Sequence, residues 1–148
     1  MATAMPALDY EQEQCASESE AGSSLLLQSQ RQELHAEIQR AKSIPKVHGR
    51  EGLYSEETLD RAIAFLRAHI ERLWQSYGVK APMPVIGPGP NRSVDLFWET
   101  PPWQLLVNIP ASTNTLATFY GHDQNRQKIK GSFDPQTFSF SVAACLMV

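Results

Sequence analysis

A segment dense in proline and glycine divides the sequence into two halves with different hydrophobic periods. Residues 81–90 (APMPVIGPGP) contain four prolines and two glycines. Each proline fixes φ and lacks a backbone N–H donor, so neither a helix nor a central strand can run through this segment. Its apolar residues Met83, Val85 and Ile86 indicate a connector that lies along the core. The sequence therefore predicts helices before the connector and strands after it.

Two helices are predicted before the connector. The first spans residues 25–44, where apolar residues recur at helical spacing on one side: Leu27, Leu34, Ile38 and Ala41. The second spans residues 55–77, with Ser55 as its N-terminal cap and Gly78 as the left-handed residue that ends it. Its apolar stripe consists of Leu59, Ile63, Leu66, Ile70, Leu73, Trp74 and Tyr77. A stripe this broad must be buried, most simply against a sheet.

After the connector the hydrophobic period changes to two, which is typical of strands. Five short strands are predicted within residues 93–147, the fourth of them over residues 128–133 and the last over residues 138–145. The turns between them are too short for parallel crossovers, so the strands must run antiparallel. The predicted fold class is α+β, with two N-terminal helices packed on a four- to five-stranded antiparallel β-meander.

Residues 1–24 differ in composition from the rest of the chain. They contain no lysine or arginine but carry Asp9, Glu11, Glu13, Glu18 and Glu20. This composition predicts a disordered acidic leader, followed by a single α+β domain over residues 25–148. No apolar run is long enough to span a membrane and residues 1–10 lack a secretion signal, so we expect a cytoplasmic protein.

Three stretches of the predicted meander carry a resemblance. They are RSVDLFWE over residues 92–99, LLVNIP over residues 105–110 and ATFYG over residues 117–121. Together they resemble small bacterial proteins that have a Gly-Ser-aliphatic-Asp-aliphatic-x-Trp strand, a Leu-x-Ile-x-Ile-Pro strand and a Tyr-Tyr-Gly strand end. Arg92 stands where that pattern has glycine. The resemblance covers residues 85–134 and implies a shared meander and a bacterial or phage source, but no activity.

The best candidate for chemistry is the pair His122 and Asp123, with Asp95 as a second possible carboxylate. A carboxylate beside an imidazole can fix its tautomer and raise its basicity, as a small hydrolase would require. Gly-His-Asp is also typical of a turn, however, and no nucleophile motif accompanies it. We therefore expect a non-enzymatic protein and keep the hydrolase as the alternative.

The remaining histidines and cysteines do not form a recognisable metal motif. His35 and His69 are expected on the polar sides of their helices, and His48 is expected in a loop. The sequence contains no His-Glu-x-x-His or Cys-x-x-Cys pattern, and Cys15 and Cys145 alone cannot build a thiolate zinc site. We expect no metal and no cofactor.

A second alternative is nucleic-acid binding through a weak basic patch, composed of Arg92, Arg126, Lys128 and Lys130. Cations near aromatic side chains can hold single-stranded nucleic acid. Alternating lysines are equally typical of an exposed sheet edge, and the chain has a formal net charge of −3. Both observations disfavour a nucleic-acid partner.

Apolar residues project from both sides of the predicted strands, whereas one strongly amphipathic helix is available to cover them. The face expected to remain uncovered carries Phe97, Leu106 and Phe119, with Tyr120 and Trp103 near its rim. Uncovered apolar faces mark partner sites. The sequence therefore predicts a non-enzymatic interaction protein of bacterial or phage type, which binds a protein partner or a second copy through this face.

Overall fold

The computed structural model describes residues 25, 27–43, 53–123 and 125–147. The chain divides into two compact units after Gln32, and the fold described here is that of Glu33–Val148. A helix covers residues 27–43, and its residues from Glu33 onward belong to this unit. The predicted acidic leader, and the positions of Cys15 and His48, lie outside the described residues.

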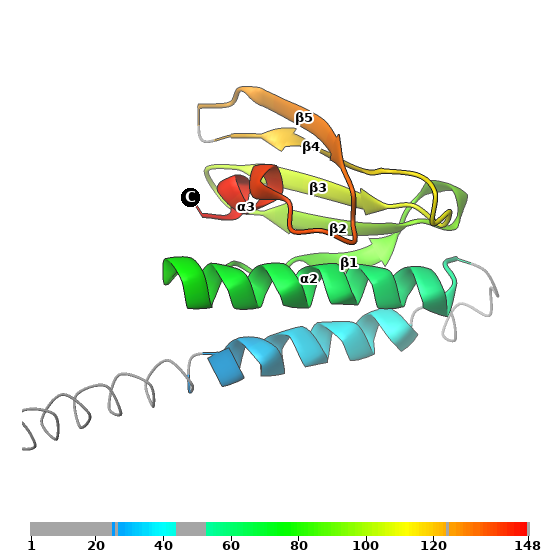
Figure 1. Cartoon of the computed structure of the whole chain (residues 1–148), viewed down its shortest axis with the longest axis horizontal. Helices are drawn as coiled ribbons and strands as arrows, with labels where there is room; N and C mark the ends of the chain where they lie inside the picture. Colours follow the sequence, from blue (N-terminus) through cyan, green and yellow to red (C-terminus); the bar gives the residue numbers. More distant parts are fainter. Residues whose placement is uncertain (1–24, 26, 44–52, 124, 148) are drawn as a thin grey trace, which may run out of the picture. The chain divides into compact units, whose positions relative to one another are not determined.

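The unit consists of one antiparallel sheet with helices on one of its faces (Figure 1), which confirms the α+β class. The strands follow one another across the sheet in chain order: β1 (Val85–Pro88), β2 (Val94–Glu99), β3 (Gln104–Ile109), β4 (Ala117–His122) and β5 (Lys128–Phe133). The labelled helices are α2 (Glu56–Tyr77) and α3 (Phe140–Leu146), and a short 3₁₀ turn, η1 (Pro90–Arg92), precedes β2. No helix within the described ranges is long and apolar enough to cross a membrane.

Helix α2 begins and ends where its local sequence predicts. The Ser55 side chain accepts a hydrogen bond from the backbone N–H of Thr58 at 3.1 Å, which satisfies one free donor of the first turn. Gly78 has φ +63°, and its N–H bonds to carbonyls of the last turn. Both predicted caps are confirmed.

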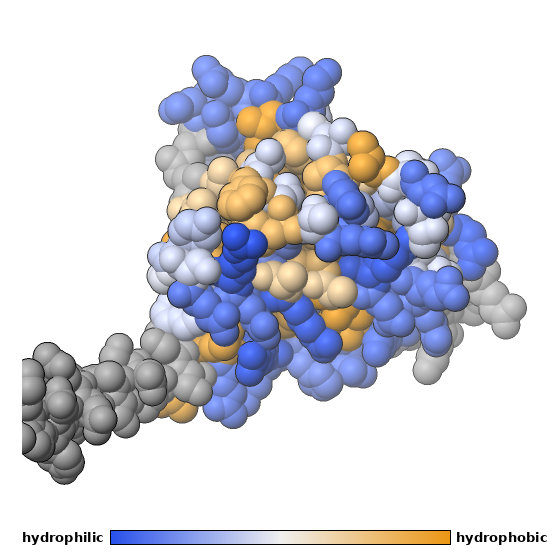
Figure 2. Space-filling view, in the orientation of Figure 1, coloured by the Kyte–Doolittle hydropathy of each residue, from blue (hydrophilic) through white to orange (hydrophobic). Residues whose placement is uncertain are grey.

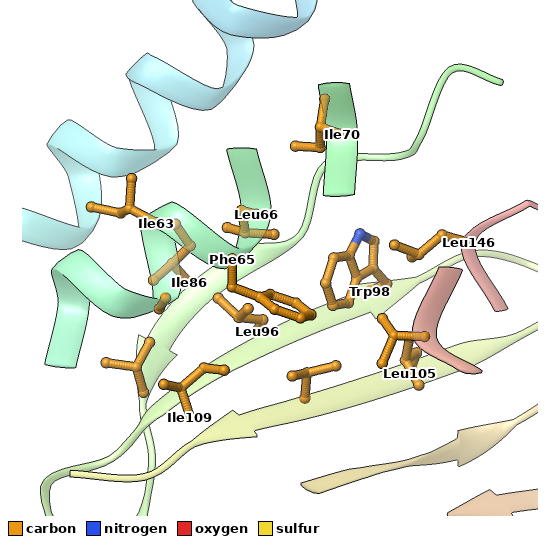
Figure 3. Packing of buried hydrophobic residues seen from close by; sticks show 14 of the residues in the cluster. Ile63, Phe65, Leu66, Ile70, Ile86, Leu96, Trp98, Leu105, Ile109 and Leu146 are labelled. Carbon is orange, nitrogen blue, oxygen red and sulfur yellow. The ribbon is translucent and has the colours of Figure 1, made fainter. Parts of the chain in front are cut away.

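The core lies between the helices and the sheet. Leu66 and Ile70 of α2 and Leu146 of α3 pack with Trp98 and Leu105 of the sheet in one buried cluster (Figure 3). The helix over residues 33–43 adds its predicted apolar positions to this cluster: Leu34, Ile38 and Ala41. The Trp98 indole N–H donates to the Pro82 carbonyl at 2.8 Å, so the connector is held along the core as predicted.

The connector also contains a strand, β1, although its density of prolines predicts no regular element there. Proline is tolerated in edge strands, where the N–H side needs no ladder partner, and β1 is such an edge. The Ile86 N–H finds its partner outside the sheet and donates to Glu37 Oε1 at 2.9 Å. Arg40 donates to the Ile86 carbonyl and also to the Glu37 carboxylate. We call Glu37 and Arg40 the edge clamp. Their side chains bond to the N–H and the carbonyl of Ile86, which an exposed edge strand would leave unpaired.

Electrostatics at the edge clamp favour the charged form of Glu37. Partial burial raises the pKa of this carboxyl, but the hydrogen bonds from Arg40 and from the Ile86 N–H, with the positive charge of Arg40, outweigh it. The pKa of Glu37 is therefore lowered from its ordinary value.

The strand predicted over residues 138–145 is wrong, because this segment forms α3. Ser139 caps the helix by accepting from the Val142 N–H at 3.3 Å. Val142, Ala143 and Leu146 then share a buried side at helical spacing. A short apolar run fits both periods, and the need to cover the sheet beside Trp98 and Leu105 favours the helix.

His69 is also placed differently from the prediction. It is 1% exposed, rather than on the polar side of α2. Its Nδ1 donates to the Phe65 carbonyl at 2.8 Å, and its Nε2 accepts from the Ser139 N–H at 2.9 Å. These two partners select one neutral tautomer, and burial lowers the pKa of His69. The ring therefore joins α2 to the start of α3. His35 is exposed, as predicted.

Candidate interaction surface

The face of the sheet opposite α2 and α3, which we call the reverse face, carries an aligned row of apolar side chains. Antiparallel pairing places Val85 beside Phe97, Phe97 beside Leu106, and Leu106 beside Tyr120. We call these four residues the apolar row. Because cross-strand partners have their side chains on the same face, the row runs unbroken over β1, β2, β3 and β4.

The apolar row is accessible from outside. Val85 is 56% exposed and Tyr120 48% exposed, and Phe97 and Leu106 are half-buried by their neighbours. Neither Phe97 nor Leu106 belongs to the hydrophobic cluster that the described residues form around α2. The row is therefore apolar surface outside the protein's own core.

Polar residues flank the apolar row on both sides. Toward one end of the strands, Asp95, Asn108 and Thr118 pair across β2, β3 and β4. The Asn108 side-chain amide donates to Asp95 Oδ1 at 2.7 Å. Toward the other end, Glu99, Gln104, His122 and Lys128 pair in turn from β2 to β5. The reverse face thus has an apolar centre between two polar rims, the usual composition of an interface.

Three of the five predicted partner-binding residues lie together in the apolar row: Phe97, Leu106 and Tyr120. The other two point to the opposite side. Phe119 pairs with Val107 on the helix-covered face and is 9% exposed, and Trp103 is 5% exposed in the same core. Strand alternation gives the reason, because Phe119 and Tyr120 are neighbours in β4 and must face opposite ways.

Val85 was missed as a surface residue because its segment was expected to be a connector without a strand. A local signal was present, since two adjacent β-branched residues, Val85 and Ile86, follow Pro84 and precede Gly87. Such a doublet fits an edge strand bounded by prolines.

The residues predicted for acid–base chemistry are not brought together. Asp95 and His122 lie on opposite polar rims, four residues apart along the strand direction, which corresponds to more than about 13 Å. Asp123 Oδ1 accepts the backbone N–H groups of Asn125 at 2.9 Å and Gln127 at 2.8 Å. This carboxylate therefore holds the β4–β5 loop in the turn conformation.

His122 lines an open depression together with Thr100, Pro102, Trp103 and Arg126. The His122 and Tyr120 rings lie edge to face, with their centroids 6.0 Å apart. Among the described residues, no three His, Cys, Asp or Glu side chains come close enough to hold a metal ion.

The predicted basic residues occupy two separate places. Lys128 and Lys130 lie on the reverse face of β5, and Arg126 lies in the loop before this strand. Arg92 is in η1, ahead of β2 and near the Asp95 end of the sheet. Its φ of +61° lies in the left-handed region that favours glycine. The four residues therefore do not form one continuous patch.

A second exposed apolar place lies on the helix-covered side. Apolar surface gathers over α3 in Figure 2, where Phe140 is 64% exposed. The Arg72 guanidinium lies 4.2 Å from the centre of the Phe138 ring, which stacks on the buried His69 at 4.5 Å. These contacts attach α3 to α2, so this cluster has a structural role within the chain.

Comparisons with protein-family models, with curated proteins and with solved structures find no match for this chain. The chemistry of the reverse face is therefore the basis for assigning a role. Its side chains offer apolar contact, two aromatic rings and rim charges of both signs. Such a surface can exclude water against a complementary protein surface.

Proposed function

We propose that this chain is a non-enzymatic interaction or accessory protein, cytoplasmic and of bacterial or phage type, that binds a protein through the apolar row. The observation that carries the proposal is the register that aligns Val85, Phe97, Leu106 and Tyr120 over four neighbouring strands. A single exposed apolar residue needs no explanation, but an aligned set outside the core does.

The composition of the apolar row supports a protein partner. Phe97 and Tyr120 supply large side chains with few rotatable bonds, which are typical energetic centres of interfaces. The hydrogen bond between Asn108 and Asp95 satisfies polar atoms of the rim within the chain itself. Burial of this face therefore does not leave those atoms without a partner.

The alternatives receive less support from the same geometry. A hydrolase would need His122 beside an available carboxylate, whereas Asp95 is distant and Asp123 is engaged in its loop. A nucleic-acid site would need a continuous cationic patch, whereas Arg92 is separated from Lys128 and Lys130. The apolar row is continuous over four neighbouring strands, whereas the residues of the two alternative sites are separated from one another.

A matched pair of variants tests the proposal. Leu106→Lys places a charge at the centre of the apolar row, and Gln75→Lys adds the same charge at an exposed position of α2, away from the reverse face. Affinity capture from the source cells is compared for the tagged wild type and both variants, with urea unfolding as a check that each is folded. We expect Leu106→Lys to lose the bound protein and Gln75→Lys to retain it.

Two results would overturn the proposal. One is equal retention of bound protein by both variants, which would place binding elsewhere. The other is a wild-type chain that binds neither another protein nor itself.

A further inference from the structure

Charges of opposite sign lie on opposite sides of Leu106 on the reverse face. Glu99 lies on β2, as does Asp95, whereas Lys128 and Lys130 lie on β5. Two carboxylates and two ammonium groups balance, so this part of the face carries no net charge when His122 is neutral. A surface with an acidic side, a basic side and an apolar centre is complementary to itself.

We propose that the reverse face binds a second copy of this chain. The two sheets would meet face to face around a two-fold axis that runs parallel to β3 and passes over Leu106. This inference rests on the interaction role proposed above for the apolar row and names its occupant. A contact of this kind uses the same surface patch on both copies and closes as a dimer.

The direction of the axis decides which residues meet. An axis parallel to β3 places β4 of one copy over β2 of the other. Tyr120 then faces Phe97 of the second copy, and Leu106 faces its own symmetry mate.

One pair of opposite rim charges meets in the same arrangement. Lys128 comes next to Glu99 of the second copy, and the His122 ring lies over the same carboxylate. Lys130 comes over Val85, and Asp95 comes over Thr118. An axis perpendicular to the strands would instead place Lys130 over its own symmetry mate and Glu99 over Asp95. Like charges placed opposite one another disfavour association, so the charges select the parallel axis.

The area of the reverse face sets the expected affinity of the dimer. The face is five strands wide at a spacing of about 4.8 Å. Along each strand it is three residues long at a spacing of about 6.7 Å, so its projected area is roughly 500 Å². A standard interface buries about 800 Å² of accessible surface on each partner. We therefore expect a dimer that forms at micromolar or higher concentration.

Charge reversal with rescue tests both the dimer and its geometry. Sedimentation equilibrium from micromolar to millimolar concentration measures the dimer Kd of the wild type, Glu99→Lys, Lys128→Glu and the double variant. Because each contact occurs twice, we expect either single change to raise Kd by about tenfold, and the double variant to return to within about threefold of wild type. Asp60→Lys, at an exposed position of α2, is the control with the same change in charge as Glu99→Lys, and it should leave Kd unchanged.

The outcomes separate this inference from the proposed function. A wild-type chain that is monomeric at every concentration overturns the dimer. The interaction role itself still holds if Leu106→Lys loses a captured protein that Gln75→Lys retains. A dimer whose Kd is the same in Glu99→Lys and Lys128→Glu also overturns the inference, because association would then use another surface, such as the β5 edge.

Discussion

Removing the Glu37 side chain tests whether the edge clamp stabilises the sheet. Glu37 is 18% exposed, and its carboxylate accepts the Ile86 N–H at 2.9 Å while it also holds Arg40. In Glu37→Ala the Ile86 N–H loses its partner, and Arg40 loses the group that orients it toward the Ile86 carbonyl. Loss of a hydrogen bond to a charged group costs about 1.5–3 kcal/mol, and we expect a decrease of this size in the free energy of unfolding.

Two further variants separate the causes. Glu33→Ala lies one helical turn earlier and removes an ion pair with Lys80 at 3.8 Å between side chains that are each about half exposed. Exposed pairs of this kind contribute little, so its effect should stay within about 0.5 kcal/mol. Glu37→Gln keeps an acceptor for the Ile86 N–H and removes the charge, so it should lie between wild type and Glu37→Ala.

Urea unfolding as a function of pH checks the electrostatic part of the prediction. Because the pKa of Glu37 is lower in the folded chain than its ordinary value of 4.5, the charged carboxylate stabilises the fold above that value. This contribution is lost as the pH falls through the lower, folded-state pKa. The difference between wild type and Glu37→Ala should therefore shrink in acid. Equal destabilisation by Glu37→Ala and Glu33→Ala at neutral pH would refute the role of the edge clamp.

Two more predictions concern the sheet and the buried histidine. A Cβ added at Gly121 would lie 2.1 Å from the Gln104 carbonyl oxygen, whereas one added at Gly87 meets nothing within 4 Å. Gly121→Ala should thus lower the free energy of unfolding by about 1–3 kcal/mol, and Gly87→Ala should lower it by less than about 0.5 kcal/mol. Equal thermal midpoints for the two variants would contradict the packing described. Burial keeps the pKa of His69 below its ordinary value of 6.5, so stability should be full above that value and fall as the pH drops through the folded-state pKa. Urea midpoints measured across pH should fall less in His69→Gln than in the wild type and should fall as in the wild type in His35→Gln. The same dependence of the urea midpoint on pH in both variants would exclude His69 as the source.

Local patterns predicted much of the fold. Ser55 and Gly78 marked the ends of α2 because capping depends on residues adjacent to the helix. The predicted strand over residues 128–133 coincides with β5, where clear turn signals bound a short alternating run. The errors fall on segments whose local pattern fits two structures. Residues 138–145 alternate as a strand would, yet Val142, Ala143 and Leu146 also satisfy a helical period.

The candidate surface was predicted only in part, because it depends on pairing between strands that are distant along the chain. Alternation within β2 and β3 was enough to place Phe97 and Leu106 on the face away from the helices. The addition of Val85 and the exclusion of Phe119 required the register of β1 and β4. A shift of one residue in that register would move every side chain of a strand to the other face.

Short-range sequence was therefore sufficient for the α+β class, the boundaries of α2 and the change of period at the connector. Each of these depends on dihedral preferences and hydrogen bonds within a few residues. Three other features depend on long-range packing. They are the contact of Ile86 with the edge clamp, the buried link from His69 to α3, and the uncovered position of the apolar row. These features depend on which surfaces remain once α2, α3 and the five strands have packed, and no local stretch of sequence contains that information.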